Sequence, residues 1–592
     1  MTKRQQILLN GGFLLLWFVL VFLAGAPRGD FANYWTASSL WWEGADLSRV
    51  YDYRWFTAQS SRLGFSDQLV GFAVLPPPSV LFAVPLLFAG PVHGATIWWV
   101  VQGLFGVLLA GLLARSTQKP TWLGLAGLCL FYPSLQAHLY QGQFHLVAVV
   151  ALAAGFVGWR ENRPVLCGVC WGFAIGLKIF AWPLLVLSLL ARQWRQTLAM
   201  VTTLAGGGVA SVLLLGTPIH TVWLAEVAPA AAGGWFGDPW HLGYQSLGHA
   251  LRVALVDQPG GHQAFHHLPV VAAGLTLSAT VAVVSTTVLA GLRWEKLKLP
   301  ERTQLLAAAS ICGLVVGAAL SQYHLIWLMP AVALVLNKLH GEQNRSKFFM
   351  VFGLTLAILW VPLPTEPPES WHLLWPFLVV PRFWLLLLLW GVMVPWGAAR
   401  SWKWLGVLLS VVAGFQATVS PNEVGVHPLE DVNGPLISAD LVRVENGAVC
   451  WSGLRADRAG KPGRGWMGFC LNPDEHTATL EAWNAGSHVW SPSTNPQGGV
   501  AWSTASVEIE VRPRTGPDGG TLFSKEEDGQ FDIYWVGPLG TQLRLTNHPA
   551  MDVEPVWDPA RRRVWFLSDR HAGVRALRVW WIPWPSSSAS FE

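Results

Sequence analysis

Residues 7–25, ILLNGGFLLLWFVLVFLAG, form an uncharged apolar run that ends just before Arg28, Gly29 and Asp30. A helix crosses the hydrocarbon core of a bilayer with roughly 20 such residues. Similar runs recur along the chain, for instance at 270–290 and 349–364. An exported soluble protein would not carry so many further apolar runs, so we expect the first run to be an uncleaved membrane helix rather than a signal peptide.

The composition divides the chain into two parts. Of its 592 residues, 52% are hydrophobic and 12% are charged, which excludes a single soluble domain, a disordered chain and a small disulfide-rich fold. Residues 1–416 carry 24 Lys and Arg against 14 Asp and Glu, whereas residues 417–592 carry 15 against 21. We therefore expect a polytopic α-helical membrane domain over 1–416 and a smaller acidic domain over 417–592.

Basic residues gather in short connections between apolar runs, which the positive-inside rule assigns to the cytoplasm. This predicts a multi-pass protein of the cell (inner) membrane with about thirteen crossings, a cytoplasmic N-terminus and an extracytoplasmic C-terminal domain. Two segments resist a simple count. Residues 69–114 look like two helices but must cross an odd number of times, so either the prolines at 76–78 re-enter or the basic loop at 115–119 breaks the rule. Residues 165–191 must return to the side they left, which fits two short helices meeting near Lys178 and Pro183.

Several polar side chains lie within or next to apolar runs, where a charge costs roughly 2.5–3.5 kcal/mol and usually marks a functional cavity. Each also has a simpler interpretation: an N-cap for Asp30, an ordinary helix start for Gln143 and His145, and snorkelling for Lys178. A satisfied turn is the simpler interpretation for 321–324. All of them fall on the predicted outer side of the membrane, and this convergence points to one site. The set is Arg28, Asp30, Gln143, His145, Lys178 and His324.

In their order and spacing these motifs resemble the polyprenol-phosphate-sugar-dependent glycosyltransferases of family 87, which have the GT-C membrane fold and include mannosyltransferases. The resemblance covers roughly residues 7–400. The chain departs from the family at Phe144-His145 and at Tyr244, and it keeps one histidine, His324, where the family often has two. The matching residues are Asp30 and Tyr34; Pro76, Pro77 and Pro85; Gly142 and Gln143; Gly172, Gly176, Lys178 and Pro183; Gln245, Ser246, Leu247 and Arg252; and Ser321, His324, Trp327 and Pro330.

The resemblance implies transfer of a sugar, with mannose as one candidate, from a polyprenyl-phosphate donor to a lipid or glycan acceptor at the outer face. Such a transfer needs a general base and positive groups for the departing phosphate, and Asp30 is the candidate base. The candidate ligands of the donor phosphate or acceptor are Arg28, Gln143, His145, Lys178, Gln245, Ser246, Arg252 and His324. The membrane part lacks the paired acidic residues with which nucleotide-sugar enzymes hold a metal, so we expect neither metal nor cofactor.

Two other functions remain open on the sequence. A transporter or flippase for lipid-linked glycans would also place polar groups inside an apolar bundle, but we detect no internal repeat of the kind common in transporters. A non-catalytic membrane scaffold that presents the C-terminal domain is the other alternative. In every case we expect membrane lipids as partners and no nucleic acid.

Residues 417–592 change to short β-like runs separated by turn residues, which predicts an all-β domain. The stretches 489–503 and 556–570 resemble each other, and 528–570 resembles the β-propeller repeat of the periplasmic Tol-system protein. The length allows about four blades, as a closed ring, an open fragment or a sandwich. The domain is then either a stabilising appendage or a module that binds carbohydrate or a partner. Cys450 and Cys470 are its only cysteines and are candidates for one disulfide.

Overall fold

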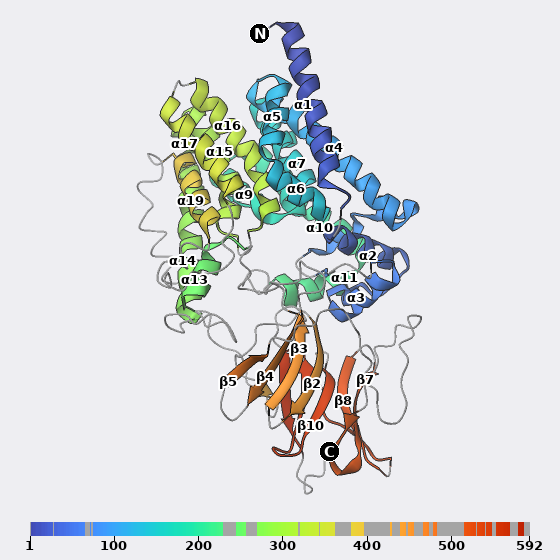
Figure 1. Cartoon of the computed structure of the whole chain (residues 1–592). Coiled ribbons are helices and arrows are strands. Elements are labelled where there is room, and N and C mark those ends of the chain that lie inside the picture. Colours follow the sequence, from blue (N-terminus) through green and yellow to red (C-terminus); the bar gives the residue numbers. More distant parts are fainter. Residues whose placement is uncertain are drawn as a thin grey trace.

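The fold is that of a computed structural model of the whole chain (Figure 1). The structure describes residues 2–27, 29–51, 53–65, 71–72, 75–228, 244–255, 269–317, 320–341, 344–361, 380–395, 427–428, 438–445, 448–454, 466–472, 477–481, 514–527, 530–538, 540–547, 552–568 and 578–584. The described residues up to 395 are mostly helical and the described strands follow, as the sequence predicts. The last described helix ends at Met393 and the first described strand begins at His427, so the expected boundary at 416 lies outside the described residues.

Among the described residues, four helical stretches are long and apolar enough to cross a membrane: Lys3–Ala24, Pro77–Thr117, Trp194–Leu215 and Val271–Lys296. The first, α1 (Lys3–Ala24), begins with a capping box in which Thr2 Oγ1 accepts from the backbone N–H of Gln5 at 3.3 Å. It ends at Gly25, whose φ of +78° suits glycine. The expected total of about thirteen crossings stays a prediction.

These spans and the shorter helices form a bundle around one large apolar core that includes Trp17, Trp171 and Trp327. Glycines let these large side chains approach neighbouring helices, as membrane helices often require. A Cβ on Gly106 would lie 2.3 Å from the Trp17 ring, and one on Gly155 would lie 2.1 Å from the Trp171 ring. The bundle contains α4 (Gly90–Thr117), α5 (Thr121–Leu130), α6 (Tyr132–Gln141), α7 (His145–Arg160), α8 (Pro164–Leu177), η4 (Ile179–Ala181), α9 (Pro183–Leu190), α10 (Trp194–Leu215), α13 (Leu247–Leu255), α14 (Pro269–Val288), η6 (Leu289–Lys296), α15 (Leu299–Val315), η7 (Gln322–Trp327), α16 (Leu328–Gly341), α17 (Arg345–Trp360) and α19 (Pro381–Met393).

A second, smaller apolar core lies at the end of the bundle that faces the strands (Figure 1). Its central side chains include Phe31, Tyr34, Val80 and Ile219, all at most 1% exposed. They come from short helices that follow α1 and α10 in the chain. These helices are α2 (Asp30–Trp42), η1 (Leu47–Tyr51), α3 (Tyr53–Arg62), η2 (Pro77–Leu81), η3 (Val84–Ala89), α11 (Thr217–Val222) and η5 (Trp223–Val227).

The two segments that resist a count from sequence have clear structures. Residues 77–89 form the short 3₁₀ helices η2 and η3, which pack on α2, and the single long helix α4 then follows. Residues 164–190 form two short helical pieces, α8 and α9, with η4 between them and a break at Lys178. The predicted meeting of two short helices near Lys178 and Pro183 is confirmed.

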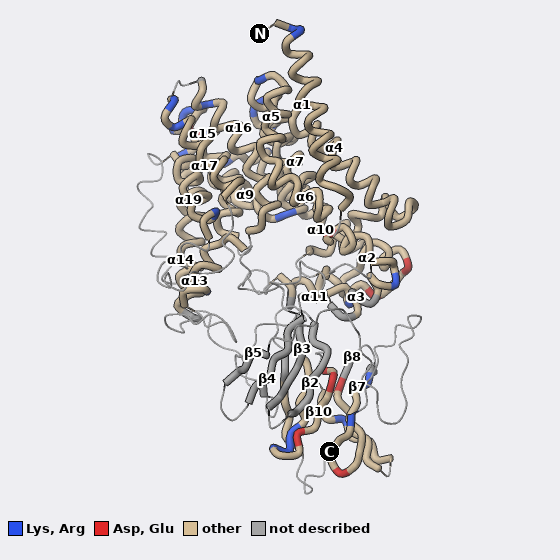
Figure 2. The backbone as a smooth tube through the Cα atoms, in the orientation of Figure 1, with Lys and Arg blue, Asp and Glu red and all other residues tan. Residues whose placement is uncertain are grey.

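Most Lys and Arg of the bundle lie at the end that carries the N-terminus, and the strands lie beyond the opposite end (Figures 1 and 2). At the basic end, Arg115 Nε donates to Glu161 Oε1 at 2.6 Å, which joins the last turn of α4 to the C-terminal end of α7. The two basic loops at 115–119 and 160–163 therefore share one side. This arrangement agrees with the positive-inside rule, although the orientation in the membrane stays a prediction.

The strands that the structure describes form three antiparallel sheets of four. The first strand, β1 (His427–Pro428), pairs with β12 (Arg578–Pro583), so the start of this region completes its last sheet. Four-stranded antiparallel sheets are what propeller blades require, while the ring and its blade count stay predictions, and 489–503 lies outside the described residues. The other strands are β2 (Ser438–Glu445), β3 (Ala448–Leu454), β4 (Trp466–Asn472), β5 (Thr477–Glu481), β6 (Arg514–Thr515), β7 (Thr521–Glu527), β8 (Gln530–Val536), β9 (Gln542–Arg544), β10 (Asp552–Asp558) and β11 (Arg563–Ser568).

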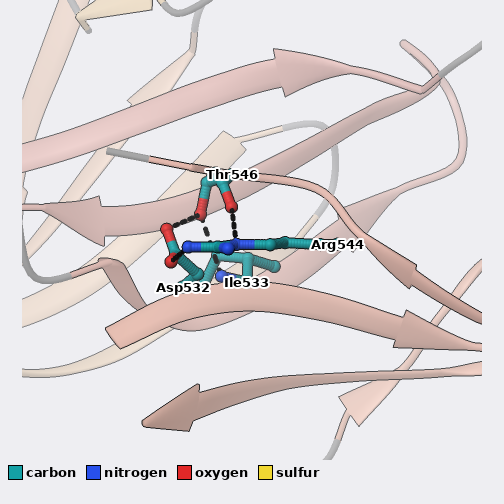
Figure 3. Close-up of polar contacts among 4 residues, drawn as sticks. All are labelled: Asp532, Ile533, Arg544 and Thr546. Carbon is teal, nitrogen blue, oxygen red and sulfur yellow. Dashed lines mark hydrogen bonds and ion pairs between the residues drawn. The ribbon is translucent and has the colours of Figure 1, made fainter. Parts of the chain in front are cut away.

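Part of the segment that resembles the Tol-system repeat has a structural role (Figure 3). Asp532, 1% exposed, accepts from Thr546 Oγ1 at 3.1 Å and from Arg544 Nη2. The same Thr546 hydroxyl accepts from the Ile533 N–H at 2.9 Å. These bonds fasten the chain after β9 to β8, so both Asp532 oxygens are used by the fold.

Candidate active site

Asp30 is the first residue of α2, at the point where the chain turns after α1. The N-cap of this helix is Gly29, whose φ of +74° favours glycine. The Asp30 carboxylate bonds to side chains rather than to the helix N–H groups. The structure therefore contradicts the N-cap interpretation of Asp30.

Two side-chain amides bind the Asp30 carboxylate, one at each oxygen. Asn33 Nδ2 donates to Oδ1 at 2.9 Å, and Gln143 Nε2 donates to Oδ2. Each amide is oriented from its far side: Gly71 N–H donates to Asn33 Oδ1 at 2.8 Å, and Tyr34 Oη donates to Gln143 Oε1 at 2.8 Å. Because both amide oxygens are already occupied, both NH₂ groups face Asp30 and favour its ionised form.

The environment of Asp30 acts on its pKa in two directions. Burial raises the pKa of this carboxyl above its ordinary value, because desolvation disfavours the charge. The positive charge of Lys178 and the amides of Gln143 and Asn33 lower it. Desolvation is the largest of these effects, so Asp30 is a stronger base than a carboxylate in water.

The position of Gln143 depends on the turn between α6 and α7. Gly142 ends α6 with a φ of +70°, and a Cβ there would lie 2.7 Å from Phe31 Cβ. Trp98 Nε1 donates to the Gly142 carbonyl at 2.9 Å and fixes the turn. The glycine therefore allows α2 to lie against this turn, which brings Gln143 to Asp30.

Lys178 interrupts the helical backbone between α8 and η4. Its charge acts on Asp30 and on three buried histidines, His138, His145 and His324. The structure thus brings a carboxylate, an ammonium group and imidazoles from four helices and the α8–η4 junction into one neighbourhood. We call Asp30, Gln143, His145, Lys178 and His324 the polar cluster.

Hydrogen bonds fix the tautomers of two histidines in the polar cluster. His145 Nδ1 accepts from Trp327 Nε1 at 3.0 Å, and His324 Nδ1 accepts from the Ser321 N–H at 2.9 Å. A nitrogen that accepts a hydrogen bond carries no proton, so each neutral ring has its proton on Nε2. The centroids of the His145 and His324 rings lie 4.8 Å apart. His145 Nε2 is buried without a hydrogen-bond partner in the described part of the chain, which leaves a donor for a ligand.

The other expected ligands are Gln245, Ser246, Arg252 and Arg28. Gln245 and Ser246 are buried. The Gln245 N–H donates to the Leu320 carbonyl at 2.9 Å, and Leu320 lies four residues before His324 in the chain. Arg252 lies in the last turn of α13. Arg28 lies outside the described residues. Among those described, no group of three or more His, Cys, Asp or Glu side chains is arranged to share a metal ion.

Residues that the sequence analysis did not select also support the site. Asn33 lies three residues after Asp30, a spacing at which helical side chains meet, so this spacing was an available signal. Gln102 and His138 are buried polar residues in apolar helices; with its amide oriented to suit its neighbours, Gln102 donates to His138 Nε2 at 2.7 Å. Arg382 is a buried cation at the start of α19.

The bundle and the polar cluster combine apolar helices of membrane-spanning length with a buried carboxylate, a lysine and imidazole N–H groups. More particularly, residues 74–322 match the model of Glycosyltransferase family 87, which indicates a glycosyltransferase. The matched stretch contains Gln143, His145 and Lys178, while Asp30 precedes it and His324 lies two residues beyond it. No curated protein and no solved structure matches the chain.

Proposed function

We propose that this protein is a membrane glycosyltransferase of the GT-C type that moves a sugar from a polyprenyl-phosphate donor to a hydroxyl of a lipid or glycan acceptor. The observation that carries the proposal is the Asp30 carboxylate, which two amides hold in the field of Lys178. The reaction takes place at the outer face of the cell membrane. Mannose is the sugar that the family resemblance favours.

In the proposed reaction, Asp30 accepts the proton of the acceptor hydroxyl as its oxygen attacks the anomeric carbon. The bond between that carbon and the phosphate oxygen breaks, and polyprenyl phosphate leaves with one more negative charge. Lys178 and the Nε2–H groups of His145 and His324 stabilise this charge as it develops. Each proton and electron pair is accounted for without a metal or cofactor.

The β region lies beyond the end of the bundle that carries α2 and α3 (Figure 1). We propose that it is extracytoplasmic and acts as a folded appendage to the enzyme. The hydrogen bonds of Asp532 support this role, because they use polar groups for folding rather than leave them for a ligand.

A direct test uses the purified full-length protein with a panel of polyprenyl-phosphate sugars and follows the release of polyprenyl phosphate. We expect release to depend on one sugar and on an added hydroxyl acceptor. Movement of a lipid-linked glycan across a vesicle membrane without bond cleavage would instead identify a transporter. Release of polyprenyl phosphate from no donor in the panel would remove the support for a transferase of this type.

A further inference from the structure

Arg382 is a buried cation outside the polar cluster. It is the second residue of α19 and its side chain is 5% exposed. Its Nη2 donates to the Val361 carbonyl at 3.1 Å, whereas Nε and Nη1 have no hydrogen-bond partner among the described residues. The guanidinium therefore presents two unused nitrogens inside the bundle.

A buried charge without a counter-charge is costly, and charged residues in membrane bundles usually pair with an opposite group or a ligand. The charge of Lys178 already interacts with that of the Asp30 carboxylate, but in the part of the chain that the structure describes no acidic side chain pairs with Arg382. The binding free energy of an anion is more favourable at such a site than beside a cation whose charge a carboxylate already balances. Arginine is also well suited to phosphate because its planar N–H groups match the phosphate oxygens.

Backbone and side-chain bonds connect Arg382 to the segment that carries His324. The Arg382 N–H donates to Gln245 Oε1 at 3.2 Å, and the Gln245 N–H donates to the Leu320 carbonyl at 2.9 Å. The next residue, Ser321, donates to His324 Nδ1 at 2.9 Å. The start of α19 is therefore tied through Gln245 to the segment that places His324 in the polar cluster.

From this geometry we propose that Arg382 binds the phosphate group of a lipid-linked substrate. The proposal rests on the proposed function for the kind of lipid, but the binding itself needs no sugar transfer. Replacing Arg382 should also affect the stability of the fold. Removing an unpaired buried charge relieves its desolvation cost, so its loss should weaken ligand binding without weakening the fold.

The test compares the full-length wild type with R382Q and R382K in detergent micelles. The probes are a polyprenyl monophosphate, the neutral polyprenol and inorganic phosphate, and the readouts are the dissociation constant and Tm. We expect polyprenyl phosphate to bind R382Q about tenfold or more weakly, with a smaller loss for R382K. We expect the Tm of ligand-free R382Q to equal or exceed that of wild type.

R302Q is the matched control, because the Arg302 guanidinium is satisfied by the carbonyls of Trp294 at 3.0 Å and Glu295 at 3.2 Å. It should bind the lipid like wild type. Arg382-dependent binding of inorganic phosphate would show that the phosphate alone suffices, and binding of the lipid only would show that the tail is also required. Unchanged affinity in R382Q, or equal binding of neutral polyprenol, would overturn the proposal. If R382Q does not purify, unchanged affinity in R382K would overturn it as well.

A separate transfer assay distinguishes the two proposals. Arg382-dependent binding without transfer by the wild type would keep the phosphate site and reject the proposed function. Transfer by the wild type with unchanged binding by R382Q would support the proposed function and reject the phosphate site at Arg382.

Discussion

The side-chain amide of Gln143 donates a hydrogen bond to Oδ2 of Asp30, although 113 residues separate the two in the chain. Tyr34 holds that amide in place from its other end, at 2.8 Å. Asn33 makes the equivalent bond to Oδ1. The candidate base thus has both oxygens held, which fixes the direction of its remaining lone pairs before substrate arrives.

Replacing Asp30 by Asn should lower kcat by about 10²–10⁴-fold, because the amide cannot accept the acceptor proton. Expression and membrane insertion should persist, since the side chain keeps its size, whereas Tm should fall slightly because the new NH₂ group faces the NH₂ of Gln143 or Asn33. Release of polyprenyl phosphate from the donor measures the effect. D46N is the control, because Asp46 is an exposed carboxylate in the connection that follows α2. Activity of D30N near that of wild type would remove Asp30 from the mechanism.

Replacing Gln143 by Leu should shift the acid limb of the pH profile of kcat/KM to higher pH. The Gln143 amide lowers the pKa of Asp30, so its loss raises that pKa, and the base is then protonated at a pH where it is ionised in wild type. At neutral pH we expect about a tenfold loss of kcat/KM, because a hydrogen bond to a charged group is removed.

Tyr34→Phe provides a graded comparison for Gln143→Leu. It removes only the group that orients the amide, so its acid limb should shift in the same direction by less. An acid limb that stays in place in both variants would show that Gln143 has only a structural role.

Replacing Lys178 by Gln should lower kcat by about 10²-fold, because a cation that stabilises the departing phosphate is lost. Lys178→Arg should recover part of the activity by restoring the charge. Steady-state kinetics with varied donor measure both variants. Lys296→Gln is the control, since Lys296 is exposed at the end of η6. Equal kcat in Lys178→Gln and wild type would favour snorkelling of Lys178 instead.

Cys450 and Cys470 should form a disulfide in protein exported to an oxidising compartment. The two residues are directly opposite each other in the β3–β4 pair, and facing residues in antiparallel strands have Cα atoms about 4.5–5.5 Å apart, within the range for a disulfide. Peptide mass spectrometry without reduction should find the linked pair. Two alkylated, unlinked peptides from protein prepared under oxidising conditions would contradict this prediction.

Replacing Asp532 by Ala should lower the free energy of unfolding of the β region by about 2–4 kcal/mol, because the Arg544 and Thr546 partners lose their buried acceptor. Limited proteolysis across a urea series measures the effect. Asn547→Ala, at a neighbouring exposed residue, should change little. Sugar transfer should persist in the folded variant if the β region is an appendage.

Much of the architecture follows from local features of the sequence. The length and polarity of the apolar runs predict a helical membrane part, and the alternation with turn residues after 417 predicts strands. The break at Lys178 was also predictable, because a cation and a nearby proline interrupt an apolar run. The crossing of 69–114 was not, because proline-rich 3₁₀ turns and a membrane helix begin with similarly apolar residues.

The polar cluster was predictable only as a set of side chains. Isolated polar residues in apolar runs identify Asp30, Gln143, His145, Lys178 and His324, because burial in lipid makes each of them costly. The sequence could not show that Gln143 holds Asp30, nor that Gln245 bonds to the segment at 320. Asn33, close to Asp30 in the chain, was missed although its spacing was visible.

The sequence by itself determines which parts of the chain form apolar helices and which form strands, because the length and periodicity of hydrophobic runs are local. It also determines which types of side chain are available for chemistry. Only the tertiary structure determines which amide binds Asp30 and which imidazole nitrogen carries the proton. It also determines which cysteines are paired in the strand register and which arginine lacks an acidic partner among the described residues. These choices depend on contacts between distant residues, and their energies come from the mutual geometry of partners that no single segment contains.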